Sequence, residues 1–181
     1  MRPWALLVLL PTAHAADALQ LQLSDAQFSH GVFHVQFEAV LEAPAAGIAA
    51  VLTDFERLGR LDPRIQRTEV LGRSPEGDVL VRTLVEACAG PFCRSVVRVE
   101  RIDREPGELL ATVVPDRSDL RQGSFRTYWE ELGPCTRVRY EADFEPAFWV
   151  PGLVGELYAT GALRASTVRV FERVERLANG R

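Results

Sequence analysis

The sequence predicts an α+β domain in which one antiparallel sheet packs against a long C-terminal helix. Between residues 68 and 145, apolar and polar side chains alternate in six runs separated by turn-forming residues, a pattern typical of an antiparallel meander. From residue 152 onward apolar residues recur at helical spacing until Asn179-Gly180, a typical helix end. The chain has no internal repeat, low-complexity segment or flexible linker. We therefore expect a single domain.

The first fifteen residues have the order of a secretory signal peptide. Arg2 supplies a positive charge, residues 4–10 form an apolar run, and Ala13-His14-Ala15 supplies the small residues that a signal peptidase recognises. The run is shorter than the roughly 20 residues that span a bilayer. We expect cleavage after Ala15, a mature domain at 16–181 and a periplasmic or secreted location. The alternative is a short buried first strand or a wrongly assigned start.

The charge balance argues against a protein that binds nucleic acid electrostatically. The chain has 21 basic and 25 acidic residues and a formal net charge of −4 at pH 7. Neutralising phosphates needs a basic surface. Every basic residue is arginine, which we attribute to a GC-rich genome and from which we infer no function.

In an oxidising compartment the three cysteines should pair where they can. Cys88 and Cys93 enclose a short turn-forming stretch between two strand-like runs, so both sulfurs should lie at the mouth of one hairpin. We expect these two to form a disulfide that contributes about 2 kcal/mol, because the closed loop is short, and Cys135 to remain unpaired. A zinc site would need two more nearby ligands, so we expect no metal.

The segment before the meander predicts a half-buried strand preceded by a short one. Residues 33–41 place apolar side chains on one side and His34, Gln36 and Glu38 on the other, which indicates a half-buried strand. An apolar-polar ripple at residues 19–23 precedes it and predicts a further short strand.

Two short helices should follow this strand. Pro44 suits the first turn of a helix whose apolar residues include Ile48 and Val51. Thr53 with Glu56 fits a capping box for a second short helix, which stops before Pro63. We expect the acidic residues Asp54, Glu56 and Asp62 to be caps or solvated positions and not catalytic groups.

The meander should contain six strands joined by short turns. The joints are Ser74-Pro75-Glu76-Gly77, Gly90-Pro91, Glu105-Pro106-Gly107 and Gly133-Pro134, all strong turn formers. The predicted strands cover residues 68–71, 79–87, 93–102, 109–114, 123–132 and 136–144.

The final helix should bury one face for about seven turns. Its expected buried residues are Val154, Leu157, Tyr158, Gly161, Ala165, Val168, Phe171, Val174 and Ala178. Gly161 and Ala165 are small residues in the middle of this face. They either leave room for a cavity or permit close packing, and the sequence favours neither reading.

This order of elements resembles the helix-grip or START-like superfamily, also called SRPBCC, in which a curved sheet wraps the last helix. Ala43-Pro44 before residues 51–55 resembles the first-helix entry of polyketide cyclase-like and coenzyme Q-binding-like members. Residues 144–151 resemble the junction before the last helix in exported members. The resemblance covers nearly all of residues 16–181 and implies a cavity between sheet and helix for lipids, sterols, polyketides or quinones.

From this resemblance and the phase of the strands we expect an exported carrier for an apolar ligand such as a lipid, isoprenoid or quinone-like molecule. We expect no cofactor, a monomeric state and no nucleic-acid partner, and we leave open transient contact with a membrane. The residues expected to line the cavity combine inward phase or junction position with large apolar area or small size: Phe125, Trp129, Tyr140, Phe148, Trp149, Leu157, Tyr158 and Gly161.

The sequence offers no catalytic set. His34 lies on the polar side of its strand, and Glu130 and Glu131 point to opposite faces because they are adjacent on a strand. An aromatic cyclase or dehydratase is one alternative, which export argues against because carrier-bound substrates are cytosolic. The other is an envelope interaction module that uses exposed Phe148 and Trp149, although we expect these aromatics to plug the end of the barrel.

Overall fold

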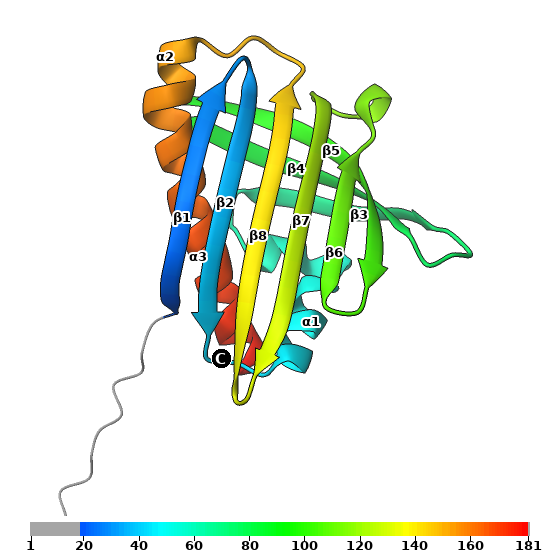
Figure 1. Ribbon diagram of the computed structural model, residues 1–181. Coiled ribbons are helices and arrows are strands. Elements are labelled where there is room, and N and C mark those ends of the chain that lie inside the picture. Colours follow the sequence, from blue (N-terminus) through cyan, green and yellow to red (C-terminus); the bar gives the residue numbers. More distant parts are fainter. Residues whose placement is uncertain (1–18, 181) are drawn as a thin grey trace, which may run out of the picture.

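A computed structural model of the protein describes residues 19–180 and contains one sheet of eight antiparallel strands (Figure 1). The strand order is β1-β2-β8-β7-β6-β5-β4-β3, so only the β2–β8 neighbours are distant in sequence. The predicted signal peptide lies outside the described residues. The strands are β1 (Gln20–Ser29), β2 (Val32–Leu41), β3 (Ile65–Arg73), β4 (Val79–Ala89), β5 (Phe92–Glu105), β6 (Glu108–Val113), β7 (Leu120–Leu132) and β8 (Cys135–Pro146).

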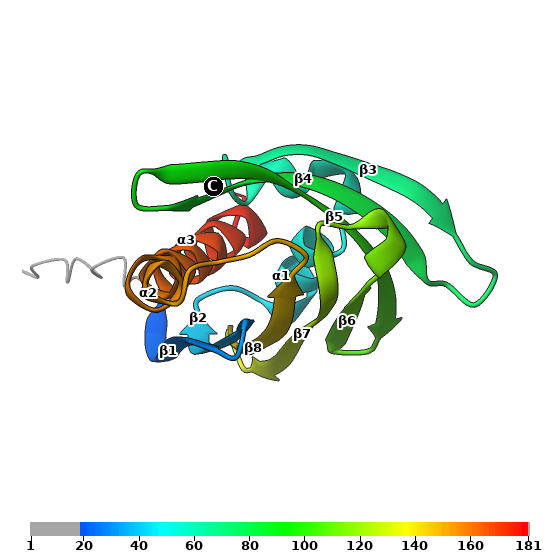
Figure 2. The same cartoon turned by 90° about the horizontal axis from the view of Figure 1, so that it is seen from above.

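The sheet curves strongly, and the C-terminal helix lies on its concave side (Figure 2). This helix runs through α2 (Gly152–Val154), a π-helical turn η3 (Gly155–Ala159) and α3 (Thr160–Ala178). The short helices α1 (Ala45–Leu52) and η1 (Phe55–Arg60) follow β2, and a single turn η2 (Pro115–Arg117) joins β6 to β7. The predicted fold, a curved meander around a long final helix with two short helices after the first long strand, is confirmed.

The core joins the helix to strands β2 and β8. Phe37 on β2 stacks on Phe171 of α3, with ring centres 4.6 Å apart and planes 9° from parallel. Val138 on β8 and Val174 on α3 are fully buried in the same cluster. Strand β2 and α3 are therefore fixed to each other by large apolar side chains.

The first strand is longer than the ripple at residues 19–23 predicts. β1 continues to Ser29 and pairs with β2 along its length, with one irregularity between Leu21 and Leu23. The missed half contains Ser24, Asp25 and Gln27, and β1 is an edge strand, where polar residues are common.

The predicted capping box at Thr53 and Glu56 is wrong. Thr53 Oγ1 donates backward to the Ala49 carbonyl oxygen at 2.8 Å, so it closes α1 and does not cap η1. Asp54 occupies the N-cap position of η1 without a side-chain cap, and it forms ion pairs with Arg57 and Arg60.

The buried face of the final helix also differs from the prediction. Thr160, Phe171 and Val174 are buried, whereas Leu157, Gly161 and Ala165 are exposed. Between Ala165 and Val174 the predicted series advances in three consecutive steps of three, and at 3.6 residues per turn such steps drift around the helix. The π-helical turn at Gly155–Ala159 rotates the preceding residues further, because it holds one extra residue.

A different glycine makes the close approach in this helix. Gly155 is buried, and a Cβ atom placed there would clash with the ring of Phe28 on β1. A Cβ on Gly161 would meet nothing within 4 Å. Close packing at Gly161 is therefore wrong, whereas the other reading, that this glycine leaves room for a ligand, stays a prediction.

Asp62 is buried and not solvated, contrary to the prediction. Its carboxylate accepts from Arg64 Nε at 3.0 Å and from Ser166 Oγ of α3 at 3.0 Å, while it also accepts from the Arg64 backbone nitrogen. Burial acts to raise the pKa of Asp62, but the bonds from Arg64 and Ser166 prevail and hold it below its usual value of 3.8. Asp62 thus joins the segment before β3 to the final helix.

Replacing Asp62 with asparagine is expected to lower the free energy of unfolding by about 1–3 kcal/mol at neutral pH, since a buried charged hydrogen-bond acceptor is lost. The pKa of Asp62 is lower in the folded than in the unfolded chain. Its contribution is therefore complete above pH about 4 and is lost as the pH falls through the folded-state value. Urea denaturation across this range measures it.

The matched control is Asp143→Asn, which removes an exposed carboxylate bound to His34. This change is expected to cost less than about 1 kcal/mol. Equal effects of the two substitutions would contradict the role given to Asp62.

The disulfide lies where the sequence places it. Cys88 on β4 is directly opposite Cys93 on β5, and their sulfurs are bonded. Gly90 in the turn between them has a φ of 62°, a left-handed conformation that suits glycine. Cys135, at the start of β8, is unpaired and partly buried.

Candidate functional site

The concave face of the sheet brings three of the predicted site residues together. Phe125 and Trp129 on β7 and Tyr140 on β8 point to this face, with outward charged residues between them along the strands. Phe125 is buried, and Trp129 and Tyr140 pack against the core but remain partly accessible. The Tyr140 ring lies 5.9 Å from that of Phe171, so these residues face the final helix.

Strand β5 adds two charged residues to the same face. Arg98 and Glu100 share the inward phase of Val96 and Ile102, which both belong to the core. Arg98 Nη2 donates to Glu100 Oε2 at 2.9 Å. The guanidinium carbon of Arg98 lies 4.4 Å from the centre of the Phe125 ring, within cation–π range. We call Arg98 and Glu100 the interior pair.

The interior pair is unusual because it lies among uncharged side chains. The Glu100 side chain is 4% exposed and that of Arg98 31%. In the strand register Arg98 lies beside Thr83, and Glu100 lies between Val81 and Val113, all three of them buried. The interior pair is therefore an ion pair set within an apolar part of the concave face.

Two pKa shifts follow from this arrangement. Burial acts to lower the pKa of Arg98, but the adjacent Glu100 carboxylate outweighs it, so the pKa is raised and the guanidinium stays charged. Burial raises the pKa of Tyr140 to about 12; Arg98 opposes this rise and Glu100 adds to it. The phenol of Tyr140 is therefore protonated at neutral pH and can donate a hydrogen bond.

The interior pair also has unused hydrogen-bonding capacity. Within residues 19–180, Arg98 Nε and Glu100 Oε1 are buried and have no hydrogen-bond partner. Most buried polar atoms in folded proteins are paired. One donor and one acceptor on the concave face thus lack a partner among the described residues.

Sequence reasoning missed the interior pair. In an antiparallel sheet, charged residues are normally assigned to the outer face, and β5 mixes charged and apolar residues in both phases. Val97 and Val99 suggest one inward phase, and Val96 and Ile102 suggest the other. The sequence did contain one signal. Val79 and Val81 of β4 have the clearer inward phase, and in the strand register they lie opposite Ile102 and Glu100 of β5.

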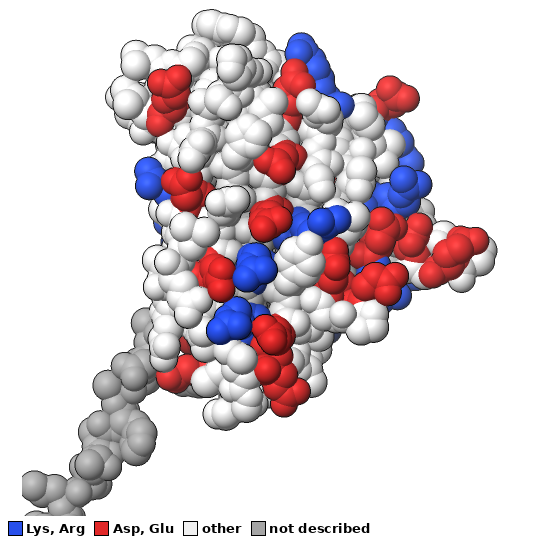
Figure 3. All heavy atoms as spheres, viewed as in Figure 1, with Lys and Arg blue, Asp and Glu red and all other residues white. Residues whose placement is uncertain are grey.

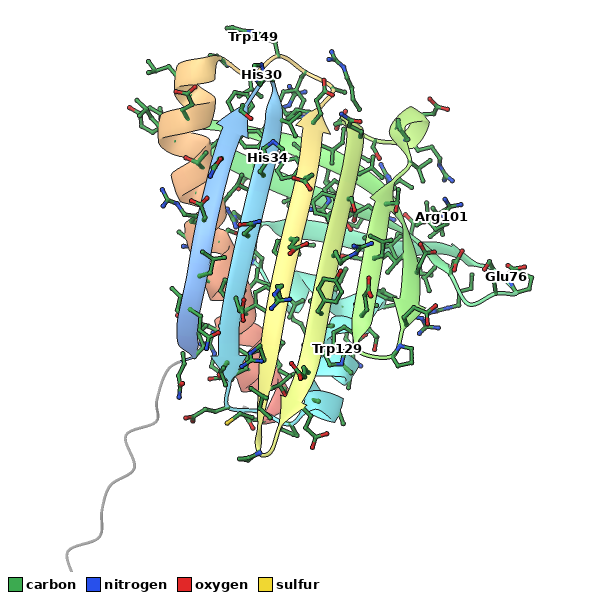
Figure 4. All side chains as sticks on the ribbon, in the orientation of Figure 1. His30, His34, Glu76, Arg101, Trp129 and Trp149 are labelled. Atoms are coloured by element: carbon green, nitrogen blue, oxygen red, sulfur yellow. A yellow bond between two sulfur atoms is a disulfide. The ribbon has the colours of Figure 1, made fainter. Side chains whose placement is uncertain are left out.

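The other predicted site residues lie at one end of the molecule. Phe148 is partly buried, and the guanidinium of Arg94 covers its ring at 3.8 Å from the centre. Trp149 is 83% exposed, so it does not plug the end of the barrel as expected. Figure 4 shows Trp149 at the end of the molecule where the β1–β2 turn lies, and Trp129 toward the opposite end.

Leu157 and Tyr158 are on the exposed side of the helix near the same end. The Tyr158 ring lies against Gly90 in the disulfide-linked β4–β5 turn. Four large exposed side chains fall within ten residues of sequence here, and we call them the end patch: Trp149, Leu153, Leu157 and Tyr158. Whether they and exposed Gly161 contact a ligand stays a prediction.

A shallow depression lies on the outer face of the sheet. It has a volume of about 310 Å³ and its lining includes Asp25, Gln27, His34, Gln36 and Glu141. His34 Nδ1 is 2.5 Å from Asp143 Oδ1 there, as expected for an outward histidine. Among the described residues no group of three or more His, Cys, Asp or Glu is placed to hold a metal ion.

The outer face carries both signs of charge, interspersed over the strands, whereas the end formed by α2 is mostly uncharged (Figure 3). No helix within residues 19–180 has the length and hydropathy needed to cross a membrane.

Comparison with family models matches residues 32–178 to the family described as "Polyketide cyclase / dehydrase and lipid transport". The match covers all elements from β2 to α3. Comparison with curated proteins gives no significant relative.

Solved structures show the same fold at low sequence identity. A START superfamily protein from Mycobacterium smegmatis is 20% identical with a TM-score of 0.60, over 81% of this chain and 94% of that one. An aromatase/cyclase from Streptomyces sp. R1128 is 20% identical with a TM-score of 0.63, over 82% and 94%. A STAR-related lipid transfer protein from Xanthomonas axonopodis is 13% identical with a TM-score of 0.59, over 90% and 99%.

Proposed function

We propose, because the chain belongs to the polyketide cyclase / dehydrase and lipid transport family, that it is an exported carrier of an apolar small molecule. The ligand, a lipid, isoprenoid or quinone-like molecule, lies between the concave face of the sheet and the helix at residues 152–178. The family description includes lipid transport, and the name of the similar Xanthomonas axonopodis protein is that of a lipid transfer protein.

The observation that carries this proposal is the interior pair. A buried ion pair contributes little to stability, because removing both charges from water costs about as much as their attraction returns. Here one donor and one acceptor of the pair also lack a partner. A ligand whose apolar body packs on Phe125, Trp129 and Tyr140 and whose polar end reaches the interior pair supplies both.

Two features support export. The order of charge, apolar run and small residues at positions 2–15 is that of a signal peptide. The Cys88–Cys93 disulfide is typical of oxidising compartments. The intact mass of the protein taken from cells tests export: the expected chain begins at Ala16, and a cytosolic chain that keeps Met1 would contradict it.

Filling the concave face is expected to abolish ligand binding. Thr127 has the inward phase of Phe125 and Trp129 and lies between Leu109 and Tyr140 in the strand register. In Thr127→Trp the indole occupies the space assigned to the ligand, so affinity for the apolar fluorophore Nile red should fall at least about tenfold. Fluorescence titration measures this change.

The matched control is Thr112→Trp, which adds the same indole on the outer face, where Thr112 lies beside Ser124 and Arg101. It should bind Nile red as the parent does. Melting curves of both variants verify folding. Equal binding by the two variants would place the fluorophore elsewhere and contradict a ligand on the concave face.

The second candidate function is an envelope interaction module, and exposed Trp149 favours it. The end patch exposes four large apolar side chains on a mostly uncharged end of the molecule, and such patches often mark contact surfaces. Two variants separate the functions. Trp149→Ser should lose its partner in a pull-down from envelope extracts if the protein is an interaction module, whereas Thr127→Trp should lose Nile red binding if it is a carrier.

A further inference from the structure

We propose that the interior pair, together with Tyr140, selects ligands whose polar end is electrically neutral and both donates and accepts a hydrogen bond. Anionic and cationic headgroups are disfavoured. A primary amide, a hydroxy-ketone and a protonated carboxylic acid have the required chemistry. This inference rests on the proposed carrier function and defines the class of ligand.

The charges of the interior pair cancel. Arg98 and Glu100 are joined at 2.9 Å, and their neighbours in the strand register, Thr83, Val81 and Val113, carry no charge. An anionic headgroup would meet an arginine already neutralised by Glu100, and a cationic headgroup would meet a carboxylate already neutralised by Arg98. Either ion would lose its hydration without gaining a free counter-charge.

The other contacts of the Arg98 guanidinium also limit the approach of a second anion. One side of Arg98 lies over the Phe125 ring. The nearest cation along the inward phase of β5 is Arg94, which is exposed and lies over Phe148 toward the end of the molecule. An anion that binds at Arg94 would therefore remain outside the apolar part of the concave face.

The unpaired atoms define what a neutral headgroup must offer. Glu100 Oε1 is an acceptor and needs a donor from the ligand, whereas Arg98 Nε is a donor and needs an acceptor. The Tyr140 phenol, which burial keeps protonated, adds a second donor. A headgroup with only acceptors leaves Glu100 Oε1 unpaired, and one with only donors leaves Arg98 Nε unpaired.

Three probes with the same ten-carbon chain test this inference: decanamide, decyl phosphate and decyltrimethylammonium. Each competes with Nile red on the full-length mature protein, below its micelle concentration. Decanamide is expected to displace Nile red at a concentration at least about tenfold lower than either ion, the factor expected for one additional satisfied buried hydrogen bond.

The Glu100→Gln variant sharpens the test because it frees the charge of Arg98. Its preference should shift toward decyl phosphate by about tenfold or more relative to the parent. The control is Glu108→Gln, which removes a carboxylate from an outer-face pair with Arg126 and should leave the preference unchanged. If Glu100→Gln does not fold, Tyr140→Phe provides the second variant and should weaken decanamide about threefold or more.

The outcomes distinguish the two proposals. If the parent binds Nile red but all three probes compete equally, or decyl phosphate competes best, the headgroup inference is overturned and the carrier function stands. An unchanged preference in Glu100→Gln and Tyr140→Phe overturns it as well. If the parent binds neither Nile red nor any probe, the carrier function itself fails.

Discussion

Phe171→Ala is expected to reduce the free energy of unfolding by about 3–5 kcal/mol, the range for truncating a buried phenylalanine. Phe171 is 3% exposed, stacks on Phe37 of β2 and contacts the Tyr140 ring. The substitution leaves a cavity where the final helix meets the sheet. Urea denaturation measures the loss, and it should be accompanied by weaker Nile red binding because the helix forms one wall of the proposed site.

Arg169→Ala is the control for this change, since Arg169 is exposed on the same helix. It should alter stability by less than about 0.5 kcal/mol. A loss of under 1 kcal/mol in Phe171→Ala would show that the sheet holds the helix by other contacts.

The second large effect is expected in Arg98→Met. Methionine keeps much of the side-chain volume but leaves the Glu100 carboxylate buried and unpaired. Breaking a buried ion pair in this way costs about 3–5 kcal/mol, a loss that urea denaturation measures at neutral pH. The partial exposure of Arg98 places the expected value toward the lower end.

The double variant Arg98→Met with Glu100→Met separates the cost of an unpaired charge from the value of the pair. Replacing both charges by apolar groups is often neutral or stabilising, so its stability should lie within about 1 kcal/mol of the parent. Its ligand preference among decanamide and the two ions should be lost. A double variant as unstable as the single one would mean that the interior pair supports the fold itself.

Much of the fold follows from local patterns. The turns at Gly77, Gly90, Gly107 and Gly133 all have positive φ, which explains why glycine marks four of the five joints of the meander, all except the one between β6 and β7. The strand pattern of β8 also survives in the structure, with Val138 and Ala142 inward. These signals are local, so a single sequence contains them.

The errors arise where tertiary contacts decide. The helix face was misplaced because the π-helical turn at Gly155–Ala159 shifts its phase, and Gly155 in that turn meets the ring of Phe28 on β1. Asp62 was expected to be solvated but is buried, because Ser166, which is distant in sequence, donates a hydrogen bond to its carboxylate. Neither partner can be identified from spacing along the chain.

The inward placement of three candidate residues was predicted from local pattern, and their contact with a ligand stays a prediction. Phe125, Trp129 and Tyr140 have large apolar side chains in a clear inward phase, and the structure brings them to one face. Arg98 and Glu100 break the rule that charges point outward, so pattern reasoning assigns them to the wrong side. Such violations are expected where function opposes the usual pattern.

Native mass spectrometry of the protein taken from its own compartment tests the carrier function most directly. The expected result is a chain that begins at Ala16 with one small apolar molecule bound, released on unfolding and found to have a neutral polar end. The Thr127→Trp variant prepared in parallel should carry none. A parent protein whose mass is that of the chain alone, and which takes up no molecule from an extract of envelope lipids, would contradict the carrier function.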